Sequence, residues 1–328
     1  MKKLLFLGDP HIMVSNLDES ERLLEFVSAS ANKNKVDAIV ILGDLYHTFA
    51  IKRTEVDYFW EKWLNILSSQ KDVYVLVGNH DMVNQGNDND TRNALAVLAR
   101  QEQSGLNIIQ APVAFGNFGF IPYFHSKQKF VEEANKLTEQ GAKVIIAHAE
   151  FNGGKFETGM YIPDGIAPDD IKADLVISGH IHSRQRFGKI TYPGTARWLT
   201  SSDKNHEKGL WLAEFNDESK LVSEEFLDTS HVCTPIYGFI YKEGEAEPVI
   251  PAGSRSSVEL IGSSEWVSKQ KARFKGLASI SSKITDKSKP ANRKTGNNLE
   301  HFVSKVFEPV SGIKKERMIE FMKELGVL

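Results

Sequence analysis

The chain has 328 residues, of which 41% are hydrophobic and 25% charged, and its formal net charge is −3. This composition is typical of a globular protein, and the length favours one large domain with a smaller one attached. No apolar run approaches the ~20 residues that span a bilayer, which excludes an integral membrane protein, and a single cysteine, Cys233, excludes an intrachain disulfide.

Strand and helix signals alternate from residue 3 to about residue 180, which is the pattern of βαβ units. Five short apolar runs in this region predict buried parallel strands, namely 4–8, 38–43, 73–78, 144–147 and 175–179. Apolar residues at helical spacing predict covering helices around 23–27 and 56–67. Trp60 and Trp63 share one face of the second helix, so we assign them to the core rather than to a base-stacking platform.

Shorter strand signals begin after residue 105 and predict a second layer of sheet. They cover 106–109, 113–115 and 118–121, and two later runs, 189–192 and 209–215, predict a hairpin in the same layer. We expect four segments: a catalytic core of residues 1–230, a small capping module of 231–278, a basic linker of 279–297 and a helical segment of 298–328. The helical segment contains two amphipathic stretches, which we expect to dock a partner.

Polar residues of the kinds that bind metals follow each of the five strands. They are Asp9 and His11, then Asp44, then Asn79 with His80 and Asp81, then His148, and finally His180 and His182. Because ligands of α/β sheets gather where parallel strands end, we expect these side chains to meet in one crevice. Carboxylate, imidazole and carboxamide donors in this number suit two adjacent divalent cations, and the lack of thiolate favours Mn²⁺, Fe²⁺ or Zn²⁺.

The order and spacing of these motifs resemble those of the calcineurin-like metallophosphoesterases over about the first 215 residues. The resemblance implies an α/β fold, a four-layer α/β/β/α sandwich, followed here by a small C-terminal α+β capping module and terminal helices. Three further segments, Gly43–His47, Tyr192–Thr195 and Glu207–Gly209, resemble segments of SbcD-type DNA nucleases. In length the chain is similar to the recombination endonuclease or exonuclease subunits of large bacteriophages, which share these motifs.

The resemblance implies a role for each motif residue. Asp9, His11 and His182 would bind one ion, Asn79, His148 and His180 the other, and Asp44 would bridge the two. The metal implied for nucleases of this kind is Mn²⁺, with Fe²⁺, Zn²⁺ or Mg²⁺ as alternatives. A bridged pair of cations can share a water, lower its pKa and clamp the oxygens of a phosphodiester.

Three residues beside the ligands are expected to act on the substrate. His80 is the candidate proton donor for the leaving 3′-oxygen, because its imidazole follows a ligand without competing for the metal. Asp81 is expected to orient the His80 ring, and His47 to shape the phosphate site. Cationic residues after the catalytic loops are candidate DNA contacts: Lys52, Arg53, Arg92, Lys155, Arg184 and Arg186.

We therefore expect a two-metal-dependent DNA nuclease, cutting as an exonuclease, an endonuclease or both, in recombination, repair or replication. Its implied partners are DNA, an SbcC-type ATPase and a second copy of the chain, without a membrane. We expect a cytoplasmic protein, in the host cytoplasm if a phage encodes it, because Met1–Lys3 leads directly into the first strand without a secretory signal. Two alternatives stay open: a metallophosphoesterase acting on small-molecule or cyclic phosphodiesters or on phosphoproteins, and a DNA-end tethering scaffold without turnover.

Overall fold

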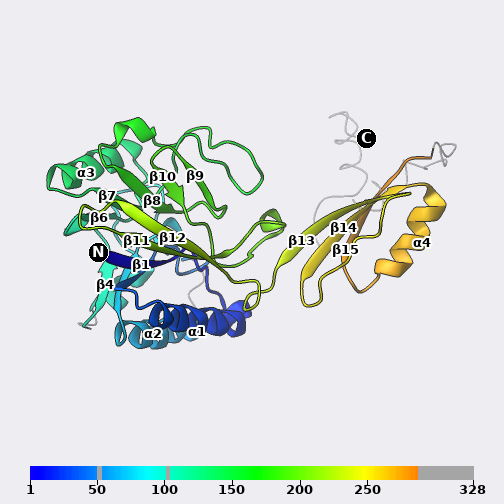
Figure 1. Ribbon diagram of the computed structural model, residues 1–328, viewed down its shortest axis with the longest axis horizontal. Coiled ribbons are helices and arrows are strands. Elements are labelled where there is room, and N and C mark those ends of the chain that lie inside the picture. Colours follow the sequence, from blue (N-terminus) through cyan, green and yellow to red (C-terminus); the bar gives the residue numbers. More distant parts are fainter. Residues whose placement is uncertain (50–53, 101–103, 287–328) are drawn as a thin grey trace, which may run out of the picture.

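Two six-stranded sheets lie face to face, with helices on the outer side of each (Figure 1). The computed structural model describes residues 1–49, 54–100 and 104–286. The predicted four-layer α/β/β/α sandwich is therefore confirmed, and a smaller module follows it in the chain (Figure 1).

The first sheet contains the amino-terminal strand. Its strands are β1 (Lys2–Leu7), β2 (Ala38–Ile41), β3 (Asp72–Leu76), β4 (Leu106–Ile109), β11 (Gly209–Phe215) and β12 (Leu221–Asp228), in the order β12-β11-β1-β2-β3-β4. β1 to β4 run parallel, whereas β11 is antiparallel to β1 and to β12. The outer face is covered by α1 (Leu17–Lys33) and α2 (Thr54–Ser68). Trp60 and Trp63 are buried there, so their predicted core role is confirmed.

The second sheet is built mainly from the middle of the chain. It contains β5 (Val113–Phe115), β6 (Phe118–Ile121), β7 (Val144–His148), β8 (Leu175–Gly179), β9 (Gln185–Phe187) and β10 (Ile190–Tyr192), in the order β5-β6-β7-β8-β10-β9. The four inner strands run parallel, and antiparallel β5 and β9 form the edges. Helix α3 (Lys127–Glu139) covers its outer face, and its N-terminus is capped by Ser126 Oγ, which accepts a hydrogen bond from Lys129 N at 3.2 Å.

Strands of the first sheet are apolar on both faces because both faces are covered. In β1, Leu5 and Leu7 pack with α1 and α2, whereas Leu4 and Phe6 belong to the core between the sheets. From the facing sheet, Ile146 of β7 enters the same central core. This double burial explains why the sequence shows continuous apolar runs instead of an alternating pattern.

The predicted hairpin of residues 189–192 and 209–215 is wrong. β10 pairs with β8 and β9 in the second sheet, whereas β11 pairs with β1 and β12 in the first. Gly188, at a φ of 52°, allows the tight turn that joins β10 to β9 instead. Residues 106–109 likewise form β4 of the first sheet and not part of the second layer.

Residues beyond 230 form the small module of strands and a helix that the sequence predicts. It consists of β13 (Ile236–Lys242), β14 (Arg255–Gly262), α4 (Ser264–Phe274) and β15 (Ser279–Ile284), with all three strands parallel. The predicted linker of 279–297 is wrong at its start, because β15 pairs with β14 as the outer strand. Its exposed serines and lysine resemble those of a linker. The remainder of that linker from residue 287, and the helical segment predicted at 298–328, lie outside the described residues.

The module contacts the core through the backbone of β13. Asn205 Nδ2 donates to the carbonyl oxygen of Gly238 at 2.9 Å, and Gly238 N donates to Asn205 Oδ1 at 3.0 Å. Arg255 Nη2 also donates to the carbonyl oxygen of Trp198 at 2.8 Å. The module thus binds the connection between β10 and β11, which also reaches the site described below.

Short 3₁₀ helices occur in several connections of the described chain. They are η1 (Val14–Asn16), η2 (Asn79–Asp81), η3 (Ala94–Ala96), η4 (Leu98–Arg100), η5 (Pro168–Asp170) and η6 (Ser201–Asp203). Among the helices of the described residues, none combines the length and the apolar character needed to cross a membrane.

Candidate metal centre

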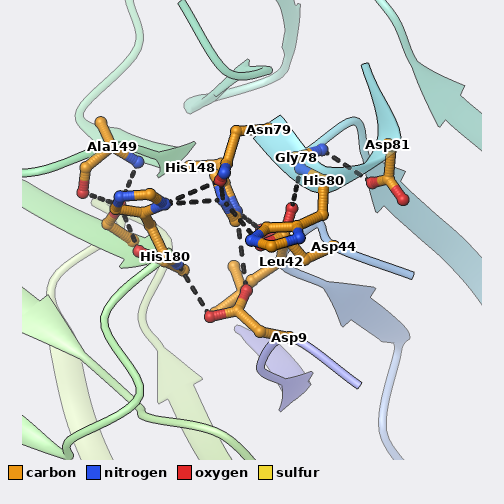
Figure 2. Close-up of polar contacts among 12 residues, drawn as sticks. Asp9, Leu42, Asp44, Gly78, Asn79, His80, Asp81, His148, Ala149 and His180 are labelled. Carbon is orange, nitrogen blue, oxygen red and sulfur yellow. Dashed lines mark hydrogen bonds and ion pairs between the residues drawn. The ribbon is translucent and has the colours of Figure 1, made fainter. Parts of the chain in front are cut away.

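The seven predicted ligands lie at or just beyond the carboxyl ends of five strands. Asp9 and His11 follow β1, Asp44 follows β2, Asn79 follows β3, His148 ends β7, and His180 and His182 follow β8. Three of these strands belong to the first sheet and two to the second, so the ligands meet where the ends of two facing sheets come together. Figure 2 shows side chains from both sheets directed toward one another.

Four of these residues have left-handed backbone conformations. The φ angles are 30° at Asp9, 43° at His11, 50° at Asp44 and 79° at His180. Such conformations cost about 1–3 kcal/mol each for residues other than glycine and gather at functional sites. The chain therefore turns sharply as it leaves these strands, at a cost that the surrounding fold must offset.

Asp44 lies between two groups of histidines. Its Oδ2 is 3.6 Å from Nε2 of His11 and 3.5 Å from Nε2 of His148. One set of donor atoms joins Asp44 with His11 and His80, a second joins it with His148 and His180, and the atoms of each set lie within 4.8 Å of one another. A carboxylate shared in this way is suited to bridge two cations.

The donor atoms of His11, His182 and Asp9 either face one another or lack a hydrogen-bond partner. Nε2 of His11 and Nε2 of His182 are 3.1 Å apart. Asp9 Oδ2 accepts a hydrogen bond from His180 N at 2.8 Å, but Asp9 Oδ1 is a buried atom without a hydrogen-bond partner in the described chain. It lies 3.5 Å from Nδ1 of His148, which already bonds Leu42, and a buried carboxylate oxygen without a hydrogen bond is costly. This donor set therefore fits a divalent cation, which would satisfy it.

The second group is centred on the carboxamide oxygen of Asn79. This Oδ1 is 2.9 Å from Nε2 of His148 and 2.8 Å from Nδ1 of His180. The two ring nitrogens are themselves 3.2 Å apart. Together with Asp44 they offer one carboxylate, one carboxamide and two imidazoles, a mixed oxygen and nitrogen set that suits a borderline divalent metal such as Mn²⁺ or Zn²⁺.

Hydrogen bonds on the outer side of the second group determine which ring nitrogens face its centre. His148 Nδ1 donates to the carbonyl oxygen of Leu42 at 2.8 Å, which directs Nε2 toward the centre of the group (Figure 2). His180 Nε2 lies 2.7 Å from Oε1 of Glu150, which leaves Nδ1 toward Asn79. A carboxylate behind a ligating histidine fixes its ring and raises its basicity. Glu150 is not among the residues predicted from the sequence, where its signal is its place two residues after His148.

Charges inside the centre shift the pKa values of its groups strongly. Burial opposes ionisation of Asp44, but the neighbouring His148 outweighs burial and holds the pKa of Asp44 well below its usual range. Burial also disfavours the charged form of His148, yet the carboxylate of Asp44 raises the pKa of His148 to about 9. Burial raises the pKa of Asp9 to about 8. Without a metal, the centre therefore compensates the charge of Asp44 by holding protons.

His80 is held by the backbone of His47 and the carboxylate of Asp44 rather than by Asp81. Its ring nitrogen Nδ1 is 2.7 Å from the carbonyl oxygen of His47, and its main-chain N donates to Asp44 Oδ1 at 2.8 Å. The expected orientation of the His80 ring by Asp81 is therefore wrong. Asp81 instead accepts hydrogen bonds from Tyr46 N at 3.1 Å and from Gly78 N at 2.9 Å, because it is buried between the two strand-end loops.

His47 lies next to this group, with its ring centroid 6.2 Å from that of His80. Its main-chain carbonyl orients His80, which no sequence pattern could have indicated. Its side chain lies at the edge of the centre, so its role at the phosphate stays a prediction.

The candidate DNA contacts differ in how far their charges are already paired. Arg92 forms paired bonds with Asp90, and Arg186 does so with Glu224. The remaining described candidates are held by aromatic rings: Lys155 Nζ is 4.7 Å from the ring centroid of Tyr161, and the guanidinium of Arg184 is 4.5 Å from that of Phe226. Arg184 also lies 3.7 Å from Glu207. Lys52 and Arg53 lie outside the described residues.

Comparisons with known proteins agree with this arrangement. Residues 2–184 match the family described as calcineurin-like phosphoesterase. The chain is 32% identical over 243 residues to "Putative phosphoesterase 244L" of Invertebrate iridescent virus 6, a match that covers 69% of this chain and 82% of the viral protein. It is 30% identical over 201 residues to "Putative phosphoesterase 078R" of Invertebrate iridescent virus 3, covering 58% of this chain and 56% of that protein.

Proposed function

We propose that this chain, which belongs to the calcineurin-like phosphoesterase family, hydrolyses the phosphodiester bonds of DNA. The observation that carries a two-metal reaction is the position of Asp44 between two groups of donor atoms. The proposed activity is that of a metal-dependent endonuclease, exonuclease or both, with Mn²⁺ as the proposed metal.

The residues of the centre would divide into two sets that share Asp44. The first set is Asp9, His11 and His182, and the second is Asn79, His148 and His180. His80, which also offers a ring nitrogen near His11 and Asp44, is assigned to the substrate instead. Divalent cations bound there would supply Lewis-acid polarisation of the phosphate and of a nucleophilic water. The task of the protein is to hold these donors in fixed positions, through the bonds to Leu42 and Glu150 and through the turns at the strand ends.

His80 would deliver the proton that the leaving oxygen requires. Its Nδ1 is engaged by the carbonyl oxygen of His47, so Nε2 is available for a substrate group. An imidazole is suited to this role because its usual pKa lies near neutral pH. Its main-chain bond to Asp44 places the proton donor beside the residue shared by both donor groups.

Two features support DNA over a small phosphodiester. The segments Tyr192–Thr195 and Glu207–Gly209, which resemble SbcD-type nucleases, both contribute to the surroundings of His182, where Lys208 and Thr195 bond its backbone. In addition, Arg184, stacked on Phe226, lies two residues beyond this ligand and is partly exposed. A cation at that point could contact a phosphate of an extended substrate.

The decisive experiment compares substrates under one set of conditions. Purified full-length protein with Mn²⁺ should cleave plasmid and oligonucleotide DNA much faster than a chromogenic phosphodiester, and a chelator should abolish both reactions. The reverse preference would favour a phosphoesterase for small molecules. DNA binding without any chelator-sensitive nicking would favour a tethering scaffold and would contradict the proposal.

We also propose an SbcC-type ATPase as partner and a homodimer as the working form. β15 ends at Ile284, and Asp286 accepts a hydrogen bond from Ser264 N at 3.0 Å, so a truncation that removes residues 287–328 should retain every described element of the module. This variant should keep Mn²⁺-dependent cleavage and lose association with the ATPase in a pull-down. Unchanged association would show that docking lies elsewhere.

A further inference from the structure

Lys208 is a buried cation that the proposed reaction does not use. Its side chain is 0% exposed and lies directly before β11. Its ammonium group has three acceptors: Asp203 Oδ1 at 2.5 Å, the carbonyl oxygen of His182 at 2.8 Å and Thr195 Oγ1 at 2.8 Å. An ammonium group has three donors, so none is left over. Burial of such a charge is costly unless it is paired and fully hydrogen-bonded, as it is here.

Asp203, the anion of this pair, is equally buried and is itself held by the backbone. Its Oδ2 accepts hydrogen bonds from Leu199 N at 3.0 Å and from Thr200 N at 2.9 Å. This leaves Oδ1 for Lys208. The position of the ammonium group is therefore fixed by the connection between β10 and β11, not by the flexible lysine chain.

His182 is a predicted ligand that lies on a loop and needs such support. It comes after the end of β8, and the intervening His180 has a left-handed backbone. The backbone of His182 is instead bound on both sides. Its N donates to Glu157 Oε1 at 2.7 Å, and its carbonyl oxygen accepts hydrogen bonds from Lys208 and from Thr195 N, the latter at 3.1 Å.

His148 in the other donor group is positioned by different means. It is the last residue of β7 and pairs with Gly179 in the sheet, while its ring is held by the carbonyl oxygen of Leu42. Loss of the Lys208 ammonium should therefore loosen His182 and leave His148 in place.

We propose that Lys208 is a positioning residue that sets the affinity of the ion bound through His11 and His182. It acts through the carbonyl oxygen of His182 and touches neither ion nor substrate. The inference rests on the metal centre of the proposed function but not on DNA being its substrate. Outer partners of metal ligands typically change metal affinity about 10- to 100-fold when they are replaced, and we expect the same range for this backbone contact.

The test is a Mn²⁺ titration of chelator-treated full-length protein by calorimetry, with electron paramagnetic resonance on the same samples. In Lys208→Met one Mn²⁺ site should weaken about 10- to 100-fold while the other keeps its affinity. At two equivalents of Mn²⁺, the spectrum should change from that of magnetically coupled ions to that of isolated ions.

Arg197→Met is the matched control. Arg197 is another buried cation, with its side chain 4% exposed and paired to Glu19, and its guanidinium bonds Ser20 rather than any predicted ligand. This variant should melt at a lower temperature and keep both Mn²⁺ sites. If Lys208→Met also melts earlier but keeps both sites at wild-type affinity, Lys208 serves only stability and the proposal is wrong.

A double variant covers the case in which Lys208→Met does not fold. Asp203→Asn with Lys208→Met removes both charges together, so no uncompensated carboxylate is left in the core. It should show the same selective loss of one Mn²⁺ site, and wild-type affinities in it would overturn the proposal. If one Mn²⁺ site is lost selectively but the wild-type protein cuts no DNA, the role of Lys208 is supported and the proposed nuclease activity is refuted. Wild-type protein that binds no Mn²⁺ would refute both.

Discussion

Asp44 and His80 are neighbours in the centre but should fail in different ways. Asp44→Asn removes the charge that both donor groups share, so it should lose Mn²⁺ binding and hydrolysis together. His80→Ala removes no expected ligand, so Mn²⁺ binding by calorimetry should stay near wild type while the cleavage rate falls about 10²- to 10⁴-fold, the usual contribution of a positioned acid. Equal loss of Mn²⁺ in the two variants would contradict these roles.

Glu150 offers a second prediction for a single side chain. Glu150→Gln keeps the shape of the side chain but removes the charge that His180 Nε2 contacts at 2.7 Å. The affinity for one Mn²⁺ should fall by about 10-fold, since the imidazole becomes less basic and less well oriented. Glu139→Gln is the control, because that carboxylate is 66% exposed on α3 and pairs with Lys172 at the surface. Similar titration curves for the two variants would rule out the role of Glu150.

At the scale of elements, the strand ends approach one another so closely that a glycine is needed between them. Gly43, after β2, has a φ of 108°, and a Cβ built there would lie 2.5 Å from Nδ1 of His148 and 3.0 Å from Cα of Gly78. The turn that carries Asp44 toward the centre thus requires both the left-handed conformation and the missing side chain.

Gly43→Ala should therefore lower both the thermal midpoint and the affinity for Mn²⁺. Gly116→Ala is the control that distinguishes backbone strain from steric collision. Gly116 also has a positive φ, of 58°, but a Cβ there would meet no atom within 4 Å. That control should cost roughly 1 kcal/mol of unfolding free energy from conformational strain and leave Mn²⁺ binding intact. Wild-type Mn²⁺ affinity in Gly43→Ala would mean that His148 can shift without consequence.

The pairing of the strands explains why two predictions were wrong, the hairpin of β10 with β11 and the linker at β15. β10 and β11 both look like hairpin strands, but the neighbours of a strand depend on which sheet it joins, and β11 pairs with the open side of β1. β15 carries a polar sequence because it is an outer strand with mostly exposed side chains, so its pairing with β14 leaves no apolar signature.

At the scale of the whole molecule, the metal-free protein should lose stability as pH rises from 7 to 9. Burial raises the pKa of Asp9 from 3.8 to about 8, and the charge of Asp44, overcoming burial, raises that of His148 from 6.5 to about 9. Between pH 7 and 9 both groups have already lost most of their protons in the unfolded chain. In the folded protein Asp9 and His148 lose theirs only across this range. The folded state binds more protons, so the free energy of unfolding falls with rising pH.

Thermal melts of chelator-treated protein across this range test the prediction. Asp9→Asn should flatten the slope, because one of the two titrating groups is gone. Protein loaded with Mn²⁺ should show little decline, since bound cations take over the compensation of charge that protons provide. A metal-free midpoint that stays level or rises between pH 7 and 9 would show that these pKa shifts do not govern stability.

The sequence by itself determined the five buried parallel strands that lead to the centre and the polar residues at their ends. Apolar runs predict buried strands locally, and parallel strands bring their carboxyl ends to one side, so the ligand residues can be grouped from the strand pattern alone. Residues such as Asp44 and His148 needed no knowledge of side-chain contacts to be selected. The α/β class follows from the same patterns, and the four layers follow from the family resemblance.

Only the tertiary structure decided which groups support those residues. Glu150 behind His180, the His47 carbonyl behind His80 and Lys208 behind His182 are contacts between loops of different strands, and their partners are set by how two sheets pack. Asp81 follows a ligand in sequence yet faces backbone amides, because burial between two loops decides its direction. The local apolar pattern of the sequence determines where a strand ends. Hydrogen bonds between distant segments depend instead on how the two sheets pack in the folded protein.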